Sequence, residues 1–174
     1  MFRSTVLMLL FLCNCIGIKE YSQTELTERH EIRINKRTKS ELWVQSLEWL
    51  YGPSGLKSSR TYYRSEEKGK IIANVSSDEN ISGFFNKEVH FTIDFTIKNG
   101  HAEIATSNPR LFGTGLLAPG DGLPINMTAE AERYKTLASR LVISYDRYIN
   151  KSEPSAEFNN KAKEPDSLIG FAGN

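Results

Sequence analysis

The stretch Val-His-Phe-Thr-Ile-Asp-Phe-Thr-Ile-Lys at residues 89–98 decides the fold of this chain. Apolar and polar residues alternate along it, and the apolar set is Val89, Phe91, Ile93, Phe95 and Ile97. A period of two predicts an antiparallel strand with one buried face and one face in water. Asn99-Gly100 follows, and both residues tolerate the positive φ angles of a type I′ turn. We therefore predict a hairpin whose second strand returns with Ala102, Ile104 and Thr106 on the buried face.

Two helices are expected around this hairpin. Thr38-Lys39-Ser40-Glu41 has the pattern of a capping box, which predicts a helix running to about Tyr51. Gly52-Pro53 should end it, with the glycine as a left-handed cap. A second helix is expected at about 128–150, where apolar residues recur at helical spacing: Tyr134, Ala138, Leu141, Tyr145 and Tyr148. This stripe should lie on the sheet.

Further strands are expected at residues 30–34, 60–66 and 70–75, where β-branched and aromatic residues gather. The predicted order is therefore β-α-β-β-β-β-α. Such an order favours an α+β fold in which an antiparallel sheet carries two helices packed on one face.

The N-terminus has the layout of a secretory leader, because the apolar run at residues 6–12 ends at Cys13-Asn14-Cys15. A membrane-spanning helix needs roughly 20 apolar residues, so this run is too short to span. Leu12-Cys13-Asn14-Cys15 resembles the bacterial lipobox, which makes Cys15 the expected site of lipid attachment, although Asn14 departs from the usual small residue before the cysteine. An ordinary signal or an uncleaved anchor are the alternatives.

The chain then divides into a leader at 1–15, a flexible tether at 16–29, one α+β domain at 30–150 and a polar, disordered tail at 151–174. Removing Arg3 with the leader leaves 21 basic and 21 acidic residues. Nucleic-acid binders normally carry a basic excess, so no nucleic-acid partner is expected. Both cysteines lie in the leader, and we therefore expect no disulfide, thiol ligand or cysteine nucleophile in the domain.

Residues 109–127 are rich in glycine and proline and are long for a connection inside a compact domain. We expect a linker here, since the Lys-Ser/Thr that a phosphate-binding loop needs after its glycines is missing. If the segment acts, its apolar residues would cover a sheet edge or dock a partner: Leu111, Phe112, Leu116 and Leu117.

No catalytic constellation is evident. The histidines are His30, His90 and His101, and the expected register places the last two roughly 26 Å apart, too far to share a metal ion. We therefore predict no enzyme activity, no metal and no cofactor.

The wet face of the hairpin is the candidate binding face, and its residues are His90, Thr92, Asp94, Thr96, Lys98, His101 and Glu103. The turn should set Thr96 opposite Glu103 and Lys98 opposite His101. Such pairs stabilise a sheet by about 0.2–1 kcal/mol each, which is the alternative to a binding role. Of the adjacent Tyr62 and Tyr63, one must also face this open side.

Residues 41–50, 67–73 and 97–100 resemble the pattern of a domain-of-unknown-function family with a TBP-like fold. The resemblance covers about residues 31–150, and the family's members are mostly bacterial, exported and often lipid-anchored. It implies the fold, and it brings no catalytic residues.

We therefore expect a non-enzymatic lipoprotein of the cell envelope, or a secreted binding domain, whose specific role the sequence does not identify. Its expected contacts are the membrane, through its lipid, and an envelope protein as partner. The alternative is a periplasmic carrier that holds a small apolar ligand between sheet and helices, near Trp43, Phe91, Phe95 and Tyr145.

Overall fold

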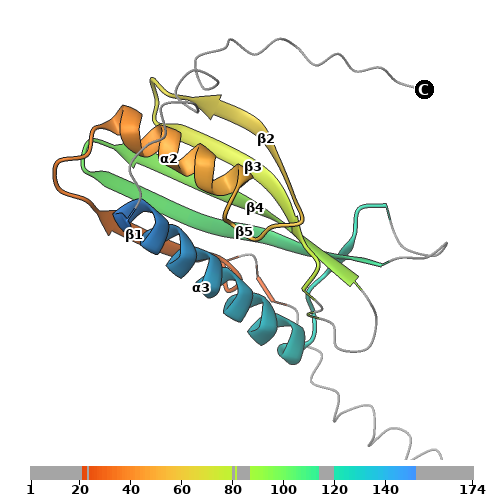
Figure 1. Cartoon of the computed structure of the whole chain (residues 1–174). Helices are drawn as coiled ribbons and strands as arrows, with labels where there is room; N and C mark the ends of the chain where they lie inside the picture. Colours follow the sequence, from red (N-terminus) through yellow and green to blue (C-terminus); the bar gives the residue numbers. More distant parts are fainter. Residues whose placement is uncertain (1–20, 23, 80, 82–86, 114–119, 152–174) are drawn as a thin grey trace, which may run out of the picture.

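The computed structural model describes residues 21–22, 24–79, 81, 87–113 and 120–151. In this part of the chain an antiparallel six-stranded sheet has the order β1-β5-β4-β3-β2, with β6 paired to β5 (Figure 1). The elements are β1 (Glu28–Arg33), α2 (Lys39–Tyr51), β2 (Ser58–Ser65), β3 (Lys70–Ser77), β4 (Lys87–Lys98), β5 (His101–Gly113), β6 (Leu123–Pro124) and α3 (Thr128–Lys151). Both helices lie on one face of the sheet, which confirms the predicted α+β class.

The central hairpin has the predicted register. Lys98 lies opposite His101, and Gly100 in the turn has a φ of 68°. The apolar side chains of β4 are almost fully buried, from 0% exposure at Val89 to 3% at Phe91. Alternation of side chains along β4 therefore assigns one set to the core and the other to solvent.

Helix α2 begins with the predicted capping box. The Glu41 amide donates to Thr38 Oγ1 at 3.2 Å, and the Thr38 amide donates to Glu41 Oε2 at 2.8 Å. The Thr38 hydroxyl also donates to Glu41 Oε2, at 3.0 Å. The two hydrogen bonds that the Thr38 amide and hydroxyl donate to the Glu41 carboxylate lower its pKa, because they favour the charged form. The expected left-handed cap at Gly52 is wrong, since its φ is −126°. Glycine is required there for space: a Cβ would lie 2.9 Å from the Glu48 carbonyl oxygen.

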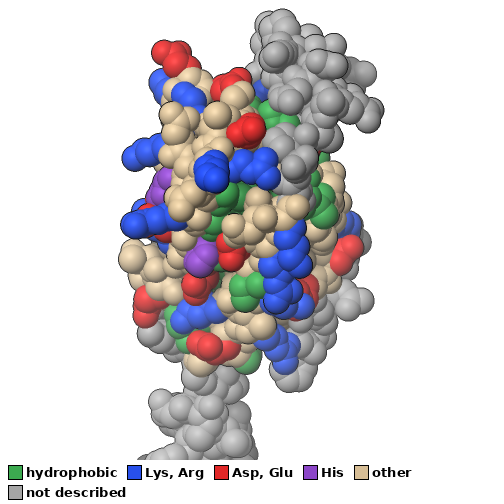
Figure 2. All heavy atoms as spheres, turned by 60° about the vertical axis from the view of Figure 1, so that its left-hand side comes forward, with side chains coloured by type: hydrophobic (Ala, Val, Ile, Leu, Met, Phe, Trp, Pro, Cys, Tyr) green, Lys and Arg blue, Asp and Glu red, His purple; other side chains and the backbone are tan. Residues whose placement is uncertain are grey.

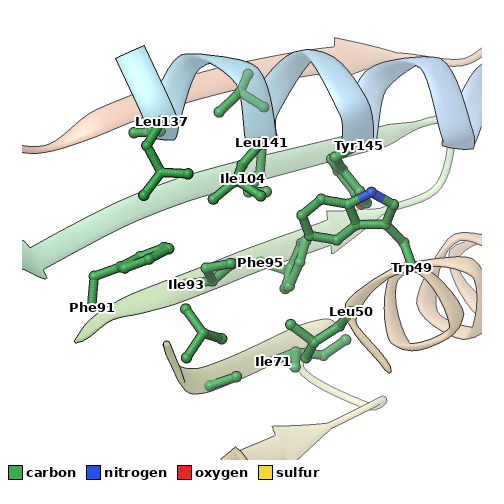
Figure 3. Packing of buried hydrophobic residues seen from close by; sticks show 14 of the residues in the cluster. Trp49, Leu50, Ile71, Phe91, Ile93, Phe95, Ile104, Leu137, Leu141 and Tyr145 are labelled. Atoms are coloured by element: carbon green, nitrogen blue, oxygen red, sulfur yellow. The ribbon is translucent and has the colours of Figure 1, made fainter. Parts of the chain in front are cut away.

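Within the hydrophobic core, an aromatic cluster of Trp49, Phe95 and Tyr145 lies where the two helices meet the sheet (Figure 3). The Trp49 ring packs edge-on against Tyr145 at a centroid distance of 5.2 Å and against Phe95 at 6.1 Å. Trp49 Nε1 donates to Ser144 Oγ at 3.2 Å, and the Tyr145 hydroxyl lies 2.7 Å from Ser46 Oγ. Burial raises the pKa of Tyr145, so its hydroxyl stays neutral and joins α3 to α2.

The ordered domain starts earlier than predicted. β1 begins at Glu28, and Leu26 is 2% exposed and belongs to the core. Residues 24–29 were expected to be part of the tether because a lone apolar residue among polar neighbours has no periodicity. Leu26 is buried by packing against the rest of the fold, which a local pattern does not reveal.

The predicted 109–127 linker is partly wrong, since β5 continues to Gly113 and residues 123–124 form β6. Asn108, with a φ of 53°, and Pro109 together lie opposite Phe91, which makes a β-bulge. A bulge is one of the few places where a strand accepts proline. Leu111 is thereby buried in the core, whereas Leu116 and Leu117 lie outside the described residues.

The leader with Cys15 and the predicted tail from residue 152 onward also lie outside the described residues. In the part of the chain that is described, neither helix combines the length and apolar character needed to cross a membrane.

Candidate functional site

The open face of the sheet, defined as the side chains that point away from α2 and α3, contains every residue of the predicted binding face. β4 and β5 place them there because they alternate with the buried residues of the same strands. Each is partly or largely exposed. They are His90, Thr92, Asp94, Thr96 and Lys98 on β4, with His101 and Glu103 on β5.

The register of this face is confirmed, but its charges pair differently from the expectation. Thr96 lies opposite Glu103, and Lys98 opposite His101. Glu103, however, forms its ion pair with Arg29 of β1, at 3.1 Å. His101 Nδ1 lies 3.4 Å from Glu31 Oε1, also on β1.

On its other side, β4 interacts with β3. Lys70 Nζ lies 2.5 Å from Asp94 Oδ1 and donates to Thr96 Oγ1 at 3.1 Å. Thr92 Oγ1 donates to Asn74 Oδ1 at 3.2 Å. The open face is therefore a ladder of cross-strand pairs over four neighbouring strands.

The sequence analysis did not identify four further residues of the open face: Arg29, Glu31, Lys70 and Asn74. Their polar character and alternation were visible, because Ile32 and the residues around Ile71 already defined the buried sets. What was missing was the pairing of β1 with β5, which joins segments far apart in the chain.

The two histidines lie at opposite ends of the face, His90 opposite Arg110 and His101 opposite Lys98. The His90 ring packs on Phe112 at a centroid distance of 4.1 Å, and its Nε2 lies 3.3 Å from Glu88 Oε2. A shared site for these histidines is thus excluded by the strand register.

Near His90, at one corner of the sheet, Lys57 Nζ donates a hydrogen bond to Glu88 Oε1. The same Nζ lies 2.8 Å from Asp78 Oδ1. Lys57 and then His90 lower the pKa of Glu88, and the two carboxylates raise the pKa of Lys57 to about 12. The corner is a charged cluster that joins β4 to the segments around Lys57 and Asp78.

Figure 2 brings forward the end of the domain that holds the Asn99-Gly100 turn. Basic and acidic side chains are interspersed over this end, and hydrophobic side chains show only as small separate areas. Within the described ranges, no three His, Cys, Asp or Glu side chains gather as metal ligands would. The open face therefore presents hydrogen-bond donors, hydrogen-bond acceptors and charges of both signs.

The residues expected to line a carrier's cavity are core residues. Phe91, Phe95 and Tyr145 are 3%, 0% and 0% exposed, and each packs against another aromatic ring. Trp43 is 3% exposed. All four residues belong to the hydrophobic core cluster between the sheet and the helices.

Residues 29–111 match a family described as "Domain of unknown function (DUF4468) with TBP-like fold". The chain is similar to the crystal structure of a DUF4468 family protein from Bacteroides ovatus, with a TM-score of 0.54, 13% identity and coverage of 80% of this chain and 94% of that one. It is also similar to a TBP-like protein from Parabacteroides distasonis, with a TM-score of 0.51, 11% identity and coverage of 72% and 94%. These likenesses show the TBP-like fold. No curated protein matches the chain.

Proposed function

Since residues 29–111 belong to the DUF4468 family, which is itself of unknown function, we propose a role from the geometry of the chain. It is a non-enzymatic binding domain, exported and anchored to a membrane of the cell envelope by lipid on Cys15. The observation that carries the proposal is the open face, where four strands present paired polar side chains to solvent while both helices occupy the opposite face.

The pairing on the open face favours a folded protein partner. Lys70 contacts both Asp94 and Thr96 before any partner arrives, so its side chain loses less conformational entropy on binding. Charges of both signs alternate across the strands, which suits a partner with a complementary mixed surface. A polyanion such as nucleic acid would also meet the carboxylates of Glu31, Asp94 and Glu103 here.

The anchor is supported by the lipobox-like Leu12–Cys15 and by the bacterial origin of the two similar structures. Leu26 is the first core residue of the described chain. A link from Cys15 to Leu26 spans at most roughly 40 Å. An anchored domain would therefore stay close to the membrane surface, and its partner is expected in the same envelope layer.

The anchor predicts a mass difference. We expect the full chain, extracted from membranes of a bacterial host, to have a mass that begins at Cys15 and includes lipid. In a Cys15→Ala variant the lipid should be absent, because the sulfur that carries it is gone. Intact-mass spectrometry of the two proteins measures this directly.

Cys13→Ala is the matched control and should keep the lipid, since the Leu-x-x-Cys spacing ends at Cys15. A wild-type protein cut elsewhere and free of lipid would contradict the anchor. The binding role of the domain would then be tested as that of a secreted protein.

The open face is tested with two identical substitutions on opposite sides of the domain. Thr92→Lys places a new charge in the middle of the open face, whereas Thr136→Lys places it on the exposed side of α3. We expect a protein cross-linked to the full chain in intact envelopes to be lost with Thr92→Lys and kept with Thr136→Lys. Quantitative mass spectrometry of the cross-linked material provides the measurement.

Equal cross-linking by both variants would show that the partner does not use this face. The absence of any cross-linked protein from the wild type would contradict the binding role itself. Melting temperatures of the two variants should agree within a few degrees, which keeps a folding defect from imitating lost binding.

A further inference from the structure

A second surface lies at the free edge of the sheet, away from the pairs of the open face. The β2 edge is defined as residues 58–65 with the neighbouring Tyr51. Among the described residues, β2 pairs with β3 alone and ends the sheet (Figure 1). Along an end strand, the outward N–H and C=O groups have no ladder partner, which makes such a strand a template for pairing with another chain.

Exposed aromatic side chains gather at this edge. Among the described residues, five large hydrophobic side chains are exposed, and three of them are Tyr51 (50%), Tyr62 (58%) and Tyr63 (37%). Adjacent strand residues normally face opposite sides, but a register shift between Thr61 and Tyr63 leaves both tyrosines accessible. Tyrosine is enriched in protein interfaces because it combines a large contact area with a polar end.

Side-chain hydrogen bonds connect the edge to α2. Ser59 Oγ donates to the Leu50 carbonyl oxygen at 3.4 Å, and the Tyr51 hydroxyl bonds to Thr61 Oγ1. At the other end of the strand, Ser40 Oγ donates to Glu66 Oε1 at 2.7 Å. Because hydrogen bonds to α2 lie near both ends of β2, the strand is already extended before a peptide pairs with it. This lowers the entropic cost of binding.

The charge of the edge selects the partner. The strand sequence Ser-Ser-Arg-Thr-Tyr-Tyr-Arg-Ser contains two arginines and no acidic residue. The register with β3 places Arg60 opposite Asn74, on the open face, and Arg64 opposite Ile71, on the core side of the sheet. A second copy of this chain, paired through the same strand, would offer Arg60 no acidic side chain. An acidic side chain opposite Arg60 in an added strand would stabilise the pair, whereas a basic one would destabilise it.

We propose that the β2 edge binds an extended acidic segment of a partner protein, which adds to the sheet as a further strand beside β2. Main-chain hydrogen bonds give the segment its register, the tyrosines contact its apolar residues, and Arg60 pairs with its carboxylates. This recognition mode is β-strand addition. It depends neither on the lipid anchor nor on the cross-strand pairs formed by β1, β3, β4 and β5.

The test is selection of peptides from a random display library on the full chain in detergent micelles. We expect the enriched sequences to alternate Asp or Glu with β-branched or aromatic residues. A synthetic copy of the strongest sequence should bind the Arg60→Glu variant about tenfold more weakly. Tyr62→Ala should also weaken binding. Lys98→Glu makes the same charge change on the open face and should leave the affinity unchanged.

Hydrogen exchange provides the signature of strand addition. Amides of residues 58–65 should exchange more slowly when the acidic peptide is bound. Any of three results would overturn the proposal: no enrichment of acidic sequences, loss of binding with Lys98→Glu in place of Arg60→Glu, or unchanged exchange along β2. Dimerisation through this edge, measured by light scattering, would also overturn it.

Discussion

Trp49→Ala is expected to lower the free energy of unfolding by about 3–5 kcal/mol, the usual cost of removing a buried aromatic ring. The Trp49 side chain is 0% exposed and packs edge-on against both Phe95 and Tyr145. Its removal leaves a cavity where the two helices meet the sheet, and Ser144 loses the indole N–H that now donates to it. Urea denaturation followed by circular dichroism measures the loss.

Tyr51→Ala is the matched control, because Tyr51 is an aromatic residue of the same helix with half of its surface exposed. Its replacement should cost about 1 kcal/mol or less, since little buried area is lost. If both variants lost the same stability, the aromatic cluster in Figure 3 would not be the centre of the core.

Gly69→Ala should be the second strongly destabilising change, with a loss of about 3 kcal/mol. Gly69 has a φ of 63°, and an added Cβ would lie 2.0 Å from the Ile97 carbonyl oxygen. The backbone is fixed at this point, because the Ile97 amide donates to the Gly69 carbonyl oxygen at 2.7 Å. The β2–β3 turn would have to move away from the end of β4.

Gly55→Ala separates the clash from the backbone strain. Gly55 has a φ of 73°, but an added Cβ would meet no atom within 4 Å. It should therefore lose only the cost of a left-handed alanine, about 1–2 kcal/mol. A loss of stability at Gly69 no larger than that at Gly55 would contradict the close approach of the β2–β3 turn to Ile97 of β4.

Local patterns predicted the secondary structure well where one segment contains all the information. The hairpin around Asn99-Gly100, the capping box at Thr38 and the stripe of α3 each depend on neighbours in the sequence. The predictions were wrong where the conformation of a segment depends on contacts with residues far away in the sequence. Pro109 signals a loop by itself, yet it lies in β5 because a bulge opposite Phe91 accommodates it.

The sequence predicted the residues of the candidate site on β4 and β5, but not their partners on the neighbouring strands. The alternation of polar and apolar residues placed the seven predicted residues, from His90 on β4 to Glu103 on β5, on one face. The turn at Asn99-Gly100 set the register of the two strands. The partners of these side chains come from β1 and β3, as with Arg29 on Glu103 and Lys70 on Asp94. The edge position of β2, on which the peptide proposal depends, likewise follows from strand order.

By itself, the sequence determined both helices, the strands other than β6 and the end of β5, which face of each is buried, and the register of the central hairpin. The physical reason is that side-chain periodicity, capping and turn geometry are local properties. Only the tertiary structure decided that β1 pairs with β5, that Leu26 joins the core and that β2 remains at the edge. These outcomes depend on contacts between segments far apart in the chain, which form where they bury the most apolar surface and leave the fewest backbone groups unpaired.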